Sequence, residues 1–167
     1  MKRELVLIRH TKSSWANFNM RDFDRPLKKD RINDALDMGQ HLKEQGLKPD
    51  LIICSPAVRT RQTAELFCDK LGYSFDQIVL DMRLYESSAA EYRQVISEVD
   101  LAIKTLVVIG HNPSITDFFN QLMDPNLDEV PTTGVIWLEF DGESWEIKNS
   151  TNGRLKKLLW PKILKML

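Results

Sequence analysis

The sequence has no long hydrophobic run, no glycine-rich phosphate loop and no excess of either charge. No segment is apolar over the roughly 20 residues that a membrane-spanning helix needs, so no integral membrane segment is expected. The 23 basic and 24 acidic residues give a net charge of -1, which provides no overall field for nucleic acid or an anionic membrane. Any anion-binding site must therefore be local.

Cysteine and export signals are also scarce. The chain has two cysteines, Cys54 and Cys68, and the apolar run near its start is short and ends at Arg9, which does not match a signal-peptide core. Without an export signal, both thiols are expected to stay reduced. The sequence therefore predicts a cytoplasmic protein.

Length and composition are typical of one globular domain. The 167 residues are 43% hydrophobic and 28% charged, which suits a single core. We expect one domain over residues 1–167, with its core at about 4–150 and a basic, apolar tail at 154–167. Because Pro161 interrupts any helix that would lie on a membrane, we expect the tail to dock on its own domain.

Short aliphatic segments alternate with longer segments of helical period. Strands are expected at 4–8, 51–54 and 106–109, with helical segments around 32–42, 57–71, 92–99 and 115–122. This alternation predicts an α/β fold of three layers, in which helices cover both faces of a mostly parallel sheet. Residues 134–140 and 145–147 flank Asp141-Gly142 and predict a hairpin near a sheet edge.

Polar and cationic residues follow three of the expected strands. They are Arg9 and His10 after the first, Ser55-Pro56 and Arg59 after the second, and His111 and Asn112-Pro113 after the third. The carboxyl ends of parallel strands meet at one edge of a sheet, so these residues are expected to share a site. Both X-Pro pairs also look like helix N-termini, which attract anions. Arginines, imidazoles and helix N-termini together suit a phosphoryl group.

Each of these side chains also has an ordinary structural interpretation. Arg9 could form a surface ion pair, His10 could be a hydrogen-bonded core imidazole, and His111 could cap a helix. Arg59 could be an exposed helical residue. Their coincidence at three strand ends favours a functional site. His41 lies within an expected helix and is interpreted as a surface residue.

Three motifs resemble those of the histidine phosphatase superfamily, whose fold is phosphoglycerate mutase-like. They are R-H at 9–10, S-P-A-V-R-T-R-Q-T-A-E at 55–65 and G-H-N at 110–112. The chain is most similar to the SixA-type phosphohistidine phosphatases, because it is short and lacks the insertions of larger mutases. The resemblance extends from residue 4 to about 140 and implies a phosphoric monoester or phosphoamide hydrolase.

The resemblance implies a catalytic role for four residues. His10 is the implied nucleophile, which takes up the phosphoryl group as a covalent phosphohistidine, and His111 is the second imidazole of the pocket. Arg9 and Arg59 are the implied phosphate-binding arginines. Water then hydrolyses the intermediate, so that one difficult step becomes two easier ones.

Other positions match the family less closely. Ser13 matches a hydroxyl position that often lines the pocket, and Asn112 belongs to the G-H-N motif, so both are expected to contact substrate. Thr11 stands where the family usually has glycine, and Ala16 replaces an asparagine often found six residues after the histidine. Arg31 replaces a common glycine, with no catalytic effect expected.

Glu86 is the candidate proton donor. It lies in R-L-Y-E-S-S, before the third expected helix. There it could protonate a leaving alkoxide, or it could be a carboxylate in the first turn of the helix that is stabilised by the helix dipole. Both interpretations stay open. A leaving imidazole needs less protonation than an alkoxide, so Glu86 bears on the substrate class.

Two other phosphatase chemistries fit poorly. No cluster of His, Asp or Glu has spacing suited to a metal, and the implied mechanism requires no metal or cofactor. Cysteine phosphatases have a C-x5-R loop, whereas the arginines that follow Cys54 come after four and six intervening residues. We therefore interpret Cys54 as a buried residue at a strand end.

The span from residue 11 to 26 is the longest stretch without a predicted element, and such loops are often functional. It contains Lys12, Trp15, Phe18, Arg21 and Arg25. We interpret it as a substrate-facing rim. Alternatively, the two aromatic residues pack the loop onto the body of the protein.

The leading hypothesis is a metal-independent phosphohistidine phosphatase that acts on a protein. The second is a phosphatase of small phosphorylated metabolites or esters, with Glu86 as the acid. A third is a non-catalytic phosphate-binding module, if Thr11 or Ala16 spoils the pocket. The expected partner is a phosphorylated protein or a small phosphorylated molecule, with no nucleic acid; the sequence specifies no oligomeric state.

Overall fold

A six-stranded sheet forms the centre of the computed structural model, which describes residues 1–124, 126–149 and 153–167. The strands are β1 (Lys2–Arg9), β2 (Leu51–Cys54), β3 (Val79–Leu80), β4 (Thr105–Gly110), β5 (Val135–Asp141) and β6 (Arg154–Leu159). Their order is β3-β2-β4-β1-β5-β6. The first four pair in parallel, whereas β5 runs antiparallel to both β1 and β6. The predicted mostly parallel sheet is confirmed.

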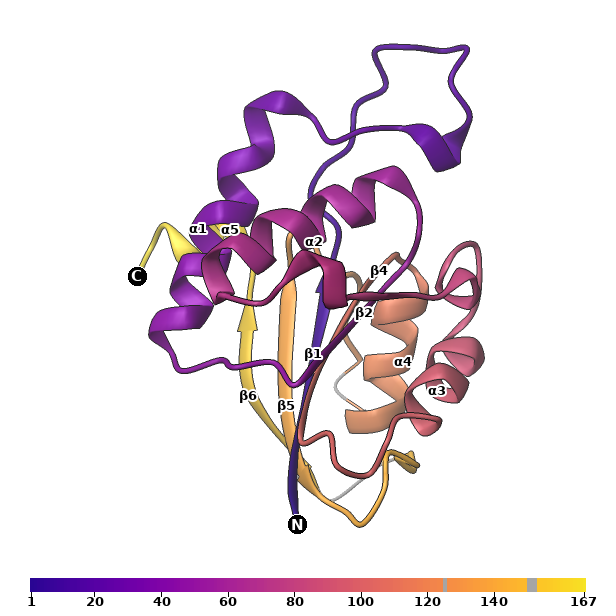
Figure 1. Cartoon of the computed structure of the whole chain (residues 1–167), viewed down its shortest axis with the longest axis vertical. Helices are drawn as coiled ribbons and strands as arrows, with labels where there is room; N and C mark the ends of the chain where they lie inside the picture. The colour runs from indigo at the N-terminus through magenta and orange to yellow at the C-terminus, as the bar shows by residue number, and fades with distance from the viewer. Residues whose placement is uncertain (125, 150–152) are drawn as a thin grey trace.

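Helices cover both faces of this sheet (Figure 1). The α-helices are α1 (Ile32–Glu44), α2 (Val58–Leu71), α3 (Ala89–Ser97), α4 (Ser114–Met123) and α5 (Pro161–Leu164). The 3-10 helices are η1 (Asp22–Asp24), η2 (Lys29–Arg31), η3 (Phe75–Gln77) and η4 (Met82–Leu84). One core cluster joins the sheet to α1 and α2, and the other joins it to α3 and α4. The three-layer α/β/α class is confirmed.

The alternation of side chains along β1 explains why this strand is central. Leu5 and Leu7 enter the core cluster of α3 and α4, while Val6 and Ile8 enter that of α1 and α2. All four side chains are fully buried. Successive residues of a strand point to opposite faces, so an uninterrupted aliphatic run suits a strand that is covered on both sides.

The predicted hairpin is wrong in its second strand. Residues 145–147 form no strand. Their alternation arises because the side chains of Trp145 and Ile147 enter the core cluster of α3 and α4. The Trp145 ring packs edge-on against Phe140 at 5.7 Å between centroids. The antiparallel partner of β5 is β6, from the expected tail, which therefore docks on its own domain as predicted. The core boundary expected at residue 150 lies outside the described residues.

The span from residue 11 to 26 is more ordered than its composition indicates. It contains η1, and an isolated antiparallel bridge joins Ser13 to Leu27. The backbone N–H of Ser14 donates to the carbonyl oxygen of Pro26 at 2.8 Å, and that of Lys28 donates to Lys12 at 2.8 Å. These bonds close the loop at its base.

Gly110, at the end of β4, leaves space for the ring of Tyr92 from α3. A Cβ atom at this glycine would lie 2.1 Å from the Tyr92 hydroxyl oxygen. That hydroxyl donates to the carbonyl oxygen of Leu84 at 2.8 Å and accepts the backbone N–H of His111 at 2.9 Å. The buried tyrosine therefore ties α3 to the residue that follows β4.

We expect Gly110→Ala to lower the free energy of unfolding by about 1–3 kcal/mol, because the added methyl group overpacks the space that Tyr92 fills. Urea denaturation measures this loss. In a Tyr92→Phe background the nearest clashing atom is absent, so the same substitution should destabilise the protein less. Equal losses in the two backgrounds would show that the hydroxyl is not the obstacle.

Candidate active site

The carboxyl ends of β1, β2 and β4 meet at one edge of the sheet, as the sequence predicts. Parallel pairing places Arg9 opposite Gly110, and the backbone N–H of His10 donates to the carbonyl oxygen of Gly110 at 3.1 Å. The backbone N–H of Ser55 donates to Ile109 at 3.0 Å. These bonds hold the three strand ends side by side.

A cavity of about 380 Å³ opens at this edge. Its lining contains all seven residues with an expected catalytic or substrate-binding role: Arg9, His10, Ser13, Arg59, Glu86, His111 and Asn112. The other lining residues are Lys12, Trp15, Arg25, Tyr85 and Thr132. The fold thus brings predicted residues from distant parts of the sequence into one place.

Two imidazoles lie close together in this cavity. The ring centroids of His10 and His111 are 5.3 Å apart, and each residue is 8% exposed. His10 Nδ1 lies 2.7 Å from the carbonyl oxygen of Thr11. Since a carbonyl only accepts hydrogen bonds, the proton of neutral His10 is assigned to Nδ1 and the lone pair to Nε2. His111 Nε2 lies 2.7 Å from Ser55 Oγ.

Burial and nearby cations keep both rings neutral. Burial lowers the pKa of His10 to about 4; the hydrogen bond to Thr11 opposes this, and the charges of Arg59 and Arg9 reinforce it. Burial likewise lowers the pKa of His111 to about 3, with further lowering by His10 and Arg59. At neutral pH, His10 therefore has the unprotonated nitrogen that a nucleophile needs.

Arg9 and Arg59 are each anchored through nitrogens at the outer end of the guanidinium group. Arg59 donates from Nη1 to the carbonyl oxygen of Asp22 at 2.7 Å and from Nη2 to its carboxylate at 3.0 Å. Arg9 donates from Nη1 to the Glu129 carboxylate at 3.1 Å and to the carbonyl oxygen of Val130 at 2.8 Å. In the part of the chain that the structure describes, the buried Nε atoms of both arginines have no hydrogen-bond partner. A buried donor without an acceptor is costly, so these groups favour an oxyanion in the cavity.

Asp22 connects three side chains of the cavity wall, and the sequence analysis did not single it out. Besides binding Arg59, its carboxylate accepts the Tyr85 hydroxyl at 2.7 Å and Arg25 Nε at 3.1 Å. Burial alone would raise the pKa of Asp22, but the hydrogen bonds from Tyr85, Arg59 and Arg25 lower it to about 2. Its partners Arg59 and Tyr85 are 37 and 63 positions away in the sequence, so no local pattern indicates this role.

Arg25 adds a third guanidinium to the cavity. It is 7% exposed and donates from Nη1 to Ser13 Oγ at 2.7 Å. Its Cζ atom lies 3.5 Å from the centroid of the Trp15 ring, a cation–π contact. Arg25 and Trp15, expected on the substrate-facing rim, both belong to the cavity lining. Ser13 lines the cavity as predicted, and its hydroxyl already accepts from Arg25.

The expected N-caps differ from the structure. Neither Ser55 nor Asn112 occupies the N-cap position, because α2 and α4 begin further along the chain. Before α2, Ala57 is still extended, with ψ of 147°. The Asn112 side chain nevertheless accepts the backbone N–H of Thr116 at 3.3 Å and donates to Val130 at 2.8 Å. Asn112 thus binds backbone of the protein itself while lining the cavity.

Comparison with known proteins identifies the family. Residues 5–102 match the model of the histidine phosphatase superfamily (branch 1). The chain belongs to this superfamily. An uncharacterized chloroplastic protein of Arabidopsis thaliana is 32% identical over 87% of this chain and 70% of that protein. A 2,3-bisphosphoglycerate-dependent phosphoglycerate mutase of Nitrobacter hamburgensis is 33% identical, but the match covers only 51% of this chain and 42% of the mutase.

Solved structures of the superfamily share the whole fold. A candidate phosphohistidine phosphatase SixA from Nakamurella multipartitia has a TM-score of 0.82 and 27% identity, covering 96% of this chain and 97% of that one. The protein histidine phosphatase SixA complexed with tungstate has a TM-score of 0.77 and 20% identity, covering 96% of this chain and 99% of that one. The phosphoglycerate mutase-like fold is therefore confirmed, and the chain is a phosphatase of the histidine phosphatase superfamily.

The departures from the superfamily motifs at Thr11 and Ala16 leave the cavity open. Thr11 is fully buried: its hydroxyl accepts from the Thr133 hydroxyl at 2.9 Å, and its backbone N–H donates to Thr63 Oγ1 at 3.0 Å. Neither Thr11 nor Ala16 belongs to the cavity lining. The added side chain of Thr11 therefore supports the loop behind His10 and does not narrow the pocket.

Glu86 lines the cavity from the segment between η4 and α3. Its φ of 49° lies in the left-handed region, which is uncommon for residues other than glycine. The alternative role in the first turn of α3 is wrong, because that helix begins at Ala89 and its first-turn acid is Glu91. Glu86 is thus presented to the cavity by a separate turn.

Neither cysteine belongs to the cavity. Cys54 and Cys68 are buried, and burial raises the pKa of both thiols, that of Cys68 to about 11. A thiol held protonated is a poor nucleophile, in agreement with the unsuitable motif spacing. Within residues 1–124, 126–149 and 153–167, no three His, Cys, Asp or Glu side chains are grouped to hold a metal ion. Over the same ranges, no helix has the length and apolar character needed to cross a membrane.

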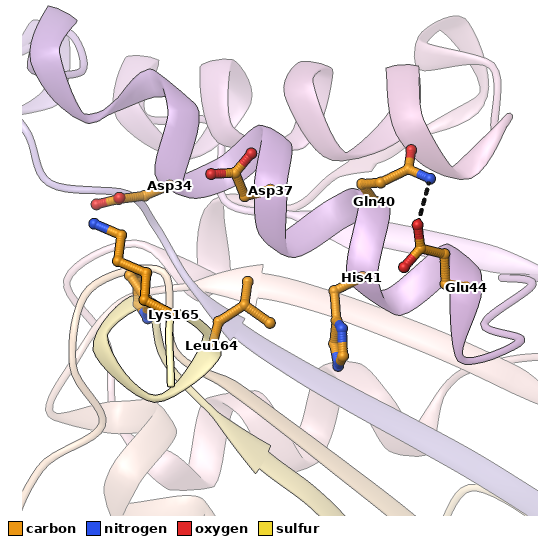
Figure 2. Close-up of a pocket in the computed structure, with 8 residues that line it drawn as sticks. Asp34, Asp37, Gln40, His41, Glu44, Leu164 and Lys165 are labelled. Carbon is orange, nitrogen blue, oxygen red and sulfur yellow. Dashed lines mark hydrogen bonds between the residues drawn. The ribbon is translucent and has the colours of Figure 1, made fainter. Parts of the chain in front are cut away.

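A second cavity, of about 300 Å³, lies between α1 and α5 (Figure 2). Its lining consists of Asp34, Asp37, Gln40, His41, Glu44, Pro161, Leu164 and Lys165. Gln40 donates to the Glu44 carboxylate at 3.0 Å, and His41, expected on the surface, is half-buried. The three carboxylates repel a phosphoryl group, so the cavity at the strand ends is the better phosphate site.

We expect the imidazoles of His10 and His111 to titrate far below the ordinary histidine pKa of 6.5. Burial holds both rings neutral until the pH falls toward 4 for His10 and 3 for His111. Arg59→Gln removes a cation that lowers both pKa values, so it should raise them. NMR titration of the ring signals, assigned with single His→Gln variants, measures these values. A midpoint at or above 6.5 in the free protein would contradict the geometry described.

Proposed function

We propose that the chain is a metal-independent phosphohistidine phosphatase that acts on a protein, with His10 as the nucleophile. The observation that carries this proposal is the pair of buried Nε–H groups on Arg9 and Arg59, which lack partners among the described residues and line one cavity with two neutral imidazoles. The similarity of the fold to SixA phosphohistidine phosphatases supports the same chemistry.

In the first step, His10 Nε2 attacks the phosphorus atom of the substrate. A new N–P bond forms as the bond between phosphorus and the substrate's imidazole breaks, and this imidazole departs with the electron pair. His10 keeps its Nδ1 proton, so positive charge develops on its ring. The Thr11 carbonyl oxygen, 2.7 Å from Nδ1, stabilises that charge. In the second step water attacks phosphorus, which releases inorganic phosphate and restores His10.

Arginine and imidazole N–H groups stabilise charge on the phosphoryl oxygens. The free Nε–H groups of Arg9 and Arg59 donate to these oxygens, and Asp22 holds Arg59 in place. If the Ser55 hydroxyl donates to His111 Nε2, then Nδ1 of neutral His111 carries a proton and donates as well. The groups are already buried and oriented, so little reorganisation is needed during the reaction.

The second candidate function is hydrolysis of small phosphorylated metabolites or esters, with Glu86 as general acid. The observation that favours it is the place of Glu86 in the cavity lining on a turn of its own. A leaving alkoxide requires a proton from the enzyme. A leaving imidazole departs as a neutral group if its other ring nitrogen already carries a proton. The dependence of each reaction on Glu86 therefore separates the two functions.

We expect incubation with N-phosphoimidazole to label His10 with acid-labile phosphate, and His10→Ala to lower turnover by more than about a thousandfold. Rapid quenching at alkaline pH followed by peptide mapping locates the label. His41→Ala is the matched control, since His41 lines the other cavity and should leave labelling and turnover unchanged. Full turnover in His10→Ala would rule out His10 as the nucleophile.

We expect Glu86→Gln to change hydrolysis of N-phosphoimidazole by less than about threefold, because the departing imidazole needs little acid assistance. Turnover of 4-nitrophenyl phosphate and of alkyl phosphates should be measured alongside. If the parent hydrolyses alkyl phosphates faster than N-phosphoimidazole, and Glu86→Gln lowers that rate by about a hundredfold, the ester function replaces the phosphohistidine function.

A further inference from the structure

Two aromatic side chains on the loop between β1 and η1 are largely uncovered. Phe18 is 94% exposed and Trp15 is 68% exposed, and Met20 nearby is 36% exposed. Figure 1 shows this loop projecting beyond the ends of the central strands. The exposure of Phe18 excludes the alternative that it packs the loop onto the body of the protein. The apolar atoms of this loop are therefore available to another molecule.

The exposed surface is continuous with the phosphate cavity. Trp15 belongs to the cavity lining, and its ring stacks on Arg25 at 3.5 Å. Arg25 binds the carboxylate of Asp22, which also binds Arg59. One side of the loop thus forms the wall of the cavity, while Phe18 extends the same loop outward.

Hydrogen bonds hold the loop in this shape. The backbone N–H of Asn19 donates to Asn17 Oδ1 at 3.0 Å, and that of Met20 donates to the carbonyl oxygen of Asn17 at 3.3 Å. These bonds form a turn over residues 17–20, in which Phe18 is the second residue and its ring is exposed. A ring presented by a hydrogen-bonded turn loses less conformational freedom on binding than one on an unstructured chain.

We propose that Trp15, Phe18 and Met20, here called the aromatic rim, bind the polypeptide that surrounds the phosphorylated side chain. The proposal rests on the proposed function and names a surface for its protein substrate. A small phosphorylated molecule held within the cavity gains nothing from Phe18, which is not part of the lining. A polypeptide extends beyond the cavity, so its apolar side chains can cover the rim while its phosphoryl group lies among the arginines.

The test compares two substrates in which the same kind of bond is broken, that between phosphorus and an imidazole nitrogen. They are a 15-residue peptide with a central phosphohistidine flanked by aliphatic residues, and N-phosphoimidazole. Covering a phenylalanine ring is worth about tenfold or more in affinity, so Phe18→Ser should raise KM for the peptide about tenfold. Its kcat, and both constants for N-phosphoimidazole, should stay unchanged. Thermal unfolding should also match that of the parent, because the ring is exposed.

Leu101→Ser is the matched control, since Leu101 is 56% exposed and lies before β4, at the opposite end of that strand from the cavity. It should leave the peptide KM unchanged. If the parent hydrolyses both substrates and Phe18→Ser leaves the peptide KM unchanged, the aromatic rim proposal is overturned while the proposed function stands. If the parent hydrolyses neither substrate, both are overturned.

A membrane surface is the other class of partner that an exposed aromatic loop fits. Co-sedimentation with vesicles of phosphatidylcholine and phosphatidylserine tests it directly. Binding by the parent that Phe18→Ser abolishes, together with an unchanged peptide KM, would assign the rim to lipid and overturn the proposal. We expect no such binding.

Discussion

Parallel pairing of β1 with β4 is the interaction on which the site depends. It places the Arg9-His10 pair beside Gly110 and His111, so that two imidazoles 101 positions apart in sequence have ring centroids 5.3 Å apart. The aliphatic residues of both strands are covered on both faces, and this burial makes the pairing stable. The buried strand ends in turn supply the desolvation that keeps both rings neutral. Core packing and the neutral state of the two imidazoles thus have one cause.

A cluster of cations needs a local counter-charge to be stable, and Asp22 supplies it. Arg59 and Arg25 approach the same cavity, where their mutual repulsion is strengthened by burial. The Asp22 carboxylate binds both and leaves Arg59 Nε–H free. Arg9 is balanced in the same way by Glu129 from the segment before β5. Arg9 and Arg59 are therefore anchored through their outer nitrogens and keep Nε–H for the ligand, whereas Arg25 uses its Nε–H to bind Asp22.

Sequence alone predicted the layers of the fold, the central strands and the grouping of Arg9, His10, Arg59 and His111 at one sheet edge. Aliphatic runs and strand-end residues are local signals, and the topology of a parallel sheet then brings them together. Asp22 and Tyr85 were missed because their roles depend on contacts across the fold, not on local spacing. The hairpin failed for a related reason: alternation at Trp145 and Ile147 reflects burial in the core, and burial does not require a strand. Ser55 and Asn112 are not N-caps because Ala57, with ψ of 147°, caps α2 and Pro113 itself caps α4, and residue preferences do not determine helix ends this closely.

The docking of the C-terminal segment has a consequence for solubility. By pairing with β5, β6 covers a strand whose residues 135–140 are all buried, and it becomes the new edge of the sheet. That edge carries Arg154, which pairs with Glu139, and Lys156, which binds Glu4 at 2.7 Å and lies over the Trp137 ring. Charged side chains on an edge strand oppose sheet extension by a second chain. The basic residues of the tail thus oppose strand pairing at this edge, and the other edge strand, β3, is two residues long.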